Sequence, residues 1–272
     1  MTAHGERWLW LSIPIALLGA MAAGSSLLFD SVYERDTEHF GTQAISQDWV
    51  TLFIAVPAIL ILGWYAYKGS FSARLMWHGV AFYFAYTYTI AVFMVRFNAL
   101  FLVYTALLGC SIFAVAGGLA ALDWSSVTPE RFGKKWPRKG TIVFLLCIVA
   151  TFTLLWLSDI VPALLAGTMP ESLSESETPT NGVQVLDLAM MLPIAGLTAW
   201  WLLRRESKGY VFAIGLVAYV CLLGVALAAM IIGLAIADLS PDVAVAVVFV
   251  IVTLVAAILL GRMFGAMKAA HH

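Results

Sequence analysis

The residues with the greatest chemical potential in this sequence are ionisable or amide side chains at the ends of long apolar segments. Burying a charged group in a bilayer costs at least ~2.5 to 3.5 kcal/mol, so such a residue indicates a functional site. If the segment ends lie at one depth, a single guanidinium would offset two or three carboxylates. We therefore predict a polar ligand-binding pocket formed by Asp48, Arg96, Asn98, Asp159 and Asp187.

A second polar group follows one helical face. His78 and Arg96 are 18 residues apart, which is five full turns of an α-helix. Thr89 and Tyr86 lie close to the same face. This spacing predicts a polar stripe of His78, Tyr86 and Thr89, which Tyr104 of the next segment would extend.

Each of these residues also has a structural interpretation. Arg96 can snorkel to lipid headgroups, and His78 can be a hydrogen-bonded packing residue. Asp48 can be the N-cap of the second segment, and Asp187 can serve the first turn of the sixth. Asp159 is the hardest to explain in this way, because apolar residues continue beyond it.

The same carboxylates allow a catalytic interpretation. Asp159 and Asp187 could act as acid and base or bind a metal, with Tyr86 or Tyr104 assisting, in an intramembrane enzyme acting on a lipid or quinone. Carboxylates alone favour Mg²⁺ or Ca²⁺. The sequence identifies no catalytic residue, metal or cofactor: no apolar segment contains the lysine that retinal needs, and a bis-histidine haem would need a second intramembrane histidine.

The elements that position these residues are predicted to be transmembrane helices. Hydrophobic residues make up 62% of the chain and charged residues 11%, far from the composition of soluble domains. Backbone amides in lipid must bond within their own segment, so long apolar runs form helices. We predict an all-α polytopic bundle in a single membrane domain, residues 1–272, with eight spans at about 8–29, 49–67, 75–95, 97–122, 141–166, 183–203, 210–237 and 243–267.

The basic residues predict the orientation. A cytoplasmic N-terminus places 13 of the 15 Lys and Arg residues on the cytoplasmic side, as the positive-inside rule requires. Both termini are then cytoplasmic, and 12 of the 16 carboxylates lie outside, Glu171, Glu175 and Asp242 among them. Two long outer loops, 30–48 and 167–182, follow from this arrangement. The negative outer face would attract cations or positively charged solutes.

Several contacts within the bundle are also predicted. Residues 75–122 form a helical hairpin with its corner at 94–98, around which the other spans pack. The small-residue pairs Gly19/Ala23 and Gly261/Gly265 favour close contacts within the bundle or between protomers. No inverted repeat is evident between the two halves. His271 and His272 are excluded from any metal argument, because they resemble a tag remnant.

Three stretches together resemble a family of uncharacterised multi-pass inner-membrane proteins from prokaryotes. They are residues 48–57 (DWVTLFIAVP), residues 96–104 (RFNALFLVY), and residues 185–193 (VLDLAMMLP) with Arg204-Arg205 and Gly209-Tyr210 behind them. An Asn often stands in that family where this chain has Thr87. The resemblance implies a prokaryotic plasma membrane and no particular activity.

The leading functional expectation is a membrane protein that handles a small solute or ion through an outward-facing polar pocket. The intramembrane enzyme and a non-catalytic accessory subunit are the alternatives. The expected partners are the lipid bilayer and a second copy or another membrane subunit. No long basic tract suggests nucleic acid.

Overall fold

The computed structural model describes residues 6–170, 172–173, 177–239 and 243–269. Over these residues it is a bundle of eight long helices, which confirms the predicted all-α fold. Seven of the helices are long and apolar enough to cross a membrane. Glu171, Glu175, Asp242, His271 and His272, used in the sequence arguments, lie outside the described residues.

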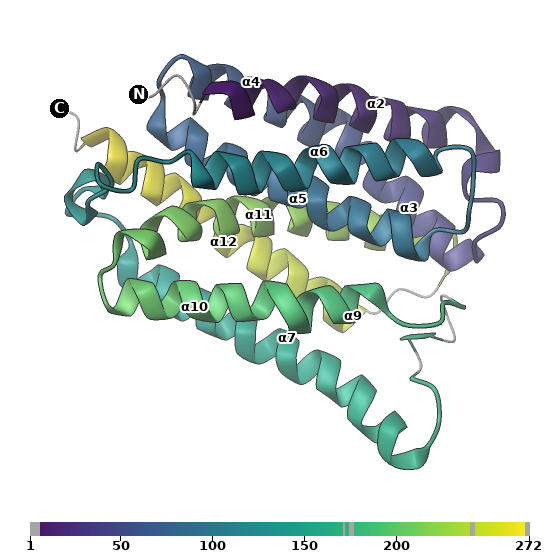
Figure 1. The fold of residues 1–272 in the computed structure, drawn as a ribbon. Coiled ribbons are helices and arrows are strands. Elements are labelled where there is room, and N and C mark those ends of the chain that lie inside the picture. Colours follow the sequence, from purple (N-terminus) through teal and green to yellow (C-terminus); the bar gives the residue numbers. More distant parts are fainter. Residues whose placement is uncertain (1–5, 171, 174–176, 240–242, 270–272) are drawn as a thin grey trace.

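The first half of the chain supplies four of these long helices (Figure 1). A 3₁₀ turn, Arg7–Leu11 (η1), leads into α2, and a π-helical turn joins α3 to α4 in one continuous helix. Their bounds are Ser12–Leu28 (α2), Glu38–Val50 (α3), Thr51–Ala55 (η3), Val56–Tyr67 (α4), Phe71–Met94 (α5) and Phe101–Ala120 (α6).

The second half repeats this order. Its elements are Arg138–Ala166 (α7), Gly182–Leu186 (α9), the π-helical turn Asp187–Met191 (η5), Leu192–Leu203 (α10), Ser207–Ile236 (α11) and Val243–Ala269 (α12). Short 3₁₀ turns at Asp30–Val32 (η2) and Pro129–Phe132 (η4) lie in the connections. The start of η1 and the end of α12 are at the same end of the bundle (Figure 1).

The second span begins earlier than predicted. Residues 30–48 were expected to form an outer loop, but α3 starts at Glu38 and runs without a break into η3 and α4. The Thr37 hydroxyl caps α3 by accepting a hydrogen bond from the Phe40 amide at 3.2 Å. Helix α3 packs against α2 and α11. Because its side chains contact other helices and not lipid, this segment can be helical without being apolar. The predicted hairpin corner is confirmed, since residues 95–100 connect α5 to α6.

The two halves are a repeat in the same orientation, whereas the sequence had been inspected only for an inverted repeat, in which the two halves would run in opposite directions. Thr51 and Asp187 are 136 residues apart. Adding 136 to the residue numbers of η3 and α4 gives the first and last residues of η5 and α10. The same shift also relates Pro57 to Pro193, each in the first turn after the π-helix. Both short turns that follow have the same backbone hydrogen bonds, and in each a basic side chain, Lys68 or Arg204, lies over a tryptophan.

The repeats meet where α5 crosses α11. Gly79 and its repeat equivalent, Gly215, lie against one another there, and a Cβ on Gly79 would overlap the Gly215 carbonyl oxygen. The other contacts follow the same symmetry, with α3 packed on α11 and α9 on α5. Since each half has four long helices, the two repeats run in the same direction along the bundle.

Helix α5 is the long helix that is not apolar enough by composition to count as a span. It lies among α4, α6 and α11, and Trp77, Tyr83 and Phe84 on it are fully buried. A helix enclosed by other helices needs little lipid-compatible surface, because its polar groups are satisfied within the protein.

The repeat gives a prediction about strain in the second turn. Arg205 has a φ of 59° at the position where the first repeat has Gly69, with a φ of 96°. A left-handed residue with a Cβ costs about 1 kcal/mol, so Arg205→Gly should stabilise the protein by up to about that amount. Arg204→Gly is the matched control and should destabilise it, because Arg204 has helical φ and covers Trp200 at 4.4 Å. Thermal unfolding of both variants in one detergent measures the difference. Equal shifts in unfolding temperature would contradict the conclusion that the left-handed backbone of Arg205 is strained.

Candidate functional site

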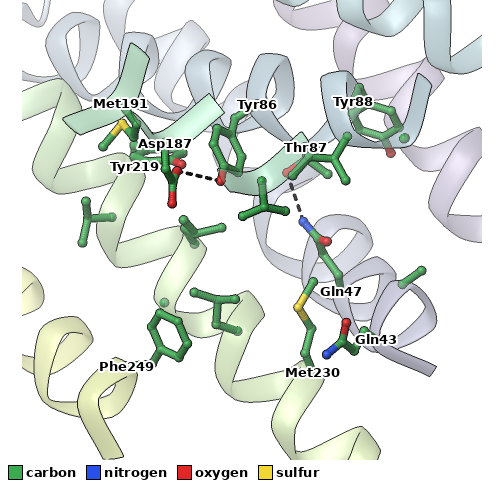
Figure 2. Close-up of a pocket in the computed structure, with 18 of the residues that line it drawn as sticks. Gln43, Gln47, Tyr86, Thr87, Tyr88, Asp187, Met191, Tyr219, Met230 and Phe249 are labelled. Carbon is green, nitrogen blue, oxygen red and sulfur yellow. Dashed lines mark hydrogen bonds between the residues drawn. The ribbon is translucent and has the colours of Figure 1, made fainter. Parts of the chain in front are cut away.

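The candidate site is a cavity of about 250 Å³ between the two repeats. Most of its lining comes from α3, α5, α7, η5, α11 and α12, with single residues from α6, α9 and α10 and with Tyr33 from the connection before α3. Figure 2 shows Asp187, Tyr86 and Tyr219 gathered at one side, with Gln43 and Gln47 of α3 across from them. The cavity lies in the half of the bundle that holds the 29–37, 95–100 and 167–181 connections.

Asp187 is the central polar group of the second repeat. Its Oδ1 accepts a hydrogen bond from the Tyr86 hydroxyl at 2.9 Å, and its Oδ2 accepts one from Trp156 Nε1 at 2.9 Å (Figure 2 shows the first). These donors come from α5 and α7, so the carboxylate joins three elements. A carboxylate has about four acceptor positions, and the two that remain are available to a ligand.

Asp48 is the second carboxylate of the cavity wall and belongs to α3 of the first repeat, although the 136-residue shift pairs Asp187 with Thr51. It is buried in α3, and its Oδ2 accepts hydrogen bonds from the hydroxyls of Ser26 and Tyr33, the latter at 2.8 Å. Burial and then the nearby charge of Asp48 raise the pKa of Tyr33 well above its usual range. Tyr33 therefore stays protonated and remains a donor. Asp48 is not an N-cap, because α3 starts ten residues before it.

Two tyrosine hydroxyls in the wall have no hydrogen-bond partner among the described residues. Tyr104 is 3% exposed and Tyr219 is 1% exposed, and both side chains line the cavity. An unsatisfied buried hydroxyl costs about 1–3 kcal/mol. These two hydroxyls are therefore the buried polar groups of the described wall whose hydrogen-bonding capacity is unmet.

The charge of the wall is negative. Among the described residues, Asp48 and Asp187 line the cavity, and no Lys, Arg or His does. The rest of the wall is mainly apolar and aromatic, with Phe40, Phe152 and Phe249 among its members. This combination suits a positively charged or hydrogen-bond-donating group and disfavours an anion.

The five residues of the predicted pocket are only partly brought together. Asp48 and Asp187 line the cavity, whereas Arg96, Asn98 and Asp159 do not. Arg96 lies in the α5–α6 connection with its side chain 46% exposed and forms an ion pair with Glu177 at 2.8 Å. Asn98 bonds to the Val32 carbonyl and the Leu100 amide, which shapes this turn. The three carboxylates therefore do not share the Arg96 guanidinium.

Asp159 has a local set of partners. Its Oδ2 accepts hydrogen bonds from Ser172 Oγ and Gln184 Nε2, both at 2.7 Å. These contacts connect the C-terminal part of α7 to the start of α9. Asp159 and Asp187 thus occupy separate polar environments.

The residues of the predicted stripe do not form one polar group, because only two of them line the cavity. Nδ1 of buried His78 bonds to the Arg74 carbonyl at 2.7 Å, and its Nε2 faces Gly118 of α6. The Thr89 hydroxyl bonds to the Ala85 carbonyl of its own helix. Tyr86 and Tyr104 are the two members of the stripe that line the cavity.

Several polar wall residues were missed from the sequence, and Trp156 and Tyr219 are among them. Tyr33, Gln43 and Gln47 belong to the segment interpreted as a loop, and Thr87 was weighed only in the family resemblance. Gln47 Nε2 donates to Thr87 Oγ1 at 3.0 Å, which connects α3 to α5 (Figure 2). The four-residue spacing of Gln43 and Gln47 was the signal available, because it places both on one helical face.

No three His, Cys, Asp or Glu side chains within the described ranges are grouped so that they could hold a metal ion. The metal-dependent version of the catalytic alternative therefore has no ligand set in the described part of the chain.

The fold and cavity together define a class: a multi-pass helical membrane protein with a ligand-sized cavity between two four-helix repeats. No family model, curated protein or solved structure matches the chain. The resemblance noted from the sequence therefore stays a prediction.

The Tyr33–Asp48 contact gives a prediction about the cavity wall. Tyr33→Phe removes one donor to a buried carboxylate and should destabilise the protein by about 1–3 kcal/mol. Tyr65→Phe is the control, because Tyr65 is 57% exposed and should shift stability by less than about 0.5 kcal/mol. Thermal unfolding of the two variants compares them, and equal stabilities would show that the contact contributes little.

Proposed function

We propose that this protein binds and handles a small solute bearing a positively charged or hydrogen-bond-donating group, which it holds between Asp48 and Asp187. One observation carries the proposal: two carboxylates line a single cavity with no basic side chain in its described wall. Within the described residues, every hydrogen-bond donor to these carboxylates is a neutral side chain. A cationic ligand would supply the missing charge, and the aromatic wall would add cation–π attraction.

The proposal includes the membrane arrangement expected from the sequence. All eight helices cross the bilayer, α5 included, since its 24 residues extend about 36 Å and a bilayer core is about 30 Å thick. Both termini are cytoplasmic, by the positive-inside rule, in the plasma membrane of a prokaryotic cell. The cavity then faces outward, where the acidic connections attract cations. A cavity at the interface of two repeats is also the usual place for a transported solute.

A binding measurement tests this function. Purified protein in lipid nanodiscs is titrated with tetramethylammonium, with tert-butanol as a neutral analogue of similar shape and with acetate as an anion. We expect a saturable rise in thermal stability with tetramethylammonium, about 2.7 kcal/mol at 100 times Kd. Acetate should give no saturable rise, and tert-butanol a much smaller one.

Variants then locate the site. Asp48→Asn and Asp187→Asn should each weaken tetramethylammonium binding by at least about tenfold, because each removes one negative charge from the wall. Asp159→Asn is the matched control and should leave binding unchanged, since Asp159 is outside the cavity. No saturable binding, or binding that only Asp159→Asn weakens, would overturn the proposal.

A further inference from the structure

The two repeats differ in how their first and last helices pack. In the first repeat α2 lies along α6, and the Trp8 ring lies directly against Gly117. In the second repeat α7 runs away from the other helices toward its C-terminal end (Figure 1). Its buried residues are mostly in the first half, whereas Leu154, Leu164 and Leu165 in the second half are 69%, 74% and 85% exposed.

The divergence leaves a second hollow between α7 and α12. This groove has a volume of about 400 Å³, and α7 supplies most of its lining. Ser158 is one of its two hydroxyl residues, and its Oγ bonds to the Leu155 carbonyl of its own helix. The groove is therefore nearly apolar. It is lined by Thr151, Phe152, Leu154, Leu155, Ser158, Val245, Val248 and Phe249.

The groove adjoins the central cavity. Phe152 and Phe249 line both hollows, and their rings stack at a centroid distance of 5.7 Å with an angle of 25°. Figure 2 shows Phe249 at the edge of the cavity opposite the Gln43 side. Two aromatic rings are thus what separates the carboxylate-lined space from the groove.

We infer that the ligand is a cationic amphiphile, which enters from the bilayer between α7 and α12 and passes Phe152 and Phe249. This inference rests on the proposed function and specifies its ligand class. The charged headgroup lies between Asp48 and Asp187, and the apolar chain lies in the groove. Two adjoining hollows, one acidic and aromatic and the other apolar, match the two parts of such a molecule. The divergence of α7 supplies the lateral entrance that the first repeat lacks.

A chain-length series tests the inference in lipid nanodiscs at constant lipid concentration. Tetramethylammonium is compared with hexyl-, octyl- and decyltrimethylammonium, at concentrations below micelle formation. Because each methylene leaves water for the groove, apparent affinity should rise several-fold per methylene, with about fourfold as the upper expectation. In Asp187→Asn every member of the series should weaken by a similar factor of at least about ten.

Filling the groove separates its contribution from that of the cavity. Ser158→Trp should weaken the binding of decyltrimethylammonium at least about tenfold and the binding of tetramethylammonium by less than about twofold. The new ring would fill the space of the alkyl chain but not that of the headgroup. Val248→Trp is a second groove variant in case the first folds poorly, and Leu165→Trp is the control on an exposed face of α7.

The outcomes distinguish the two proposals. If no cation binds, the proposed function fails and the amphiphile fails with it. If tetramethylammonium binds but chain length has no effect, the proposed function holds and this inference is overturned. Chain-length dependence that is unaffected by both groove variants also overturns it. A groove variant that changes the oligomeric mass but not the chain-length dependence assigns the groove to a second copy instead.

Discussion

Gly79→Ala should lower the stability of the bundle by about 1–3 kcal/mol, the typical cost of overpacking a well-packed core. The new Cβ would overlap the Gly215 carbonyl oxygen and approach the Ala218 Cβ to 2.9 Å. Neither neighbour is the end of a flexible side chain, so the α5–α11 crossing itself must open. Thermal unfolding and size-exclusion profiles in one detergent measure the loss.

The repeat supplies a matched control for this experiment. Gly215→Ala should be tolerated, because its Cβ would meet ordinary contacts of 3.6 Å to the Leu75 oxygen and 3.7 Å to the Gly79 nitrogen. Gly109→Ala, with no neighbouring atom within 4 Å, should be neutral or slightly stabilising, since Ala is the better helix former. Equal stability of Gly79→Ala and Gly215→Ala would contradict the close crossing.

Asp187→Ala should be the most damaging single change in the cavity wall. It leaves the Tyr86 hydroxyl and Trp156 Nε1 without their acceptor, at about 1–3 kcal/mol for each orphaned donor. It also removes one of the two charges that the proposed ligand needs. We expect a loss of about 2–5 kcal/mol in stability together with loss of tetramethylammonium binding.

Asp187→Asn separates these two effects. The amide oxygen still accepts one hydrogen bond, so most of the stability should remain while binding is weakened. Asp123→Ala, at an exposed carboxylate in the α6–α7 connection, should change neither. If Asp187→Ala is as stable as the wild type in thermal unfolding, the hydrogen bonds from Tyr86 and Trp156 contribute little to the stability of the bundle.

The second span shows the limit of reading helices from hydropathy alone. Apolar residues predicted its start at Trp49, but α3 adds the polar stretch from Glu38. That stretch is helical because it packs on α2 and α11, and those neighbours are distant in sequence. For the same reason, hydropathy did not predict that Gln43 and Gln47 line the cavity or that Asp48 lies inside a helix.

The sequence by itself determined that the chain forms long apolar helices, and it identified Asp48 and Asp187 as charged groups associated with two of them. These properties follow from the length of apolar runs and the cost of charge in lipid, which are local. Only the tertiary structure decided that the two aspartates share one cavity while Arg96 and Asp159 have other partners. The reason is geometric: the close crossing at Gly79 and Gly215 brings the repeats together, and the divergence of α7 opens the groove beside them.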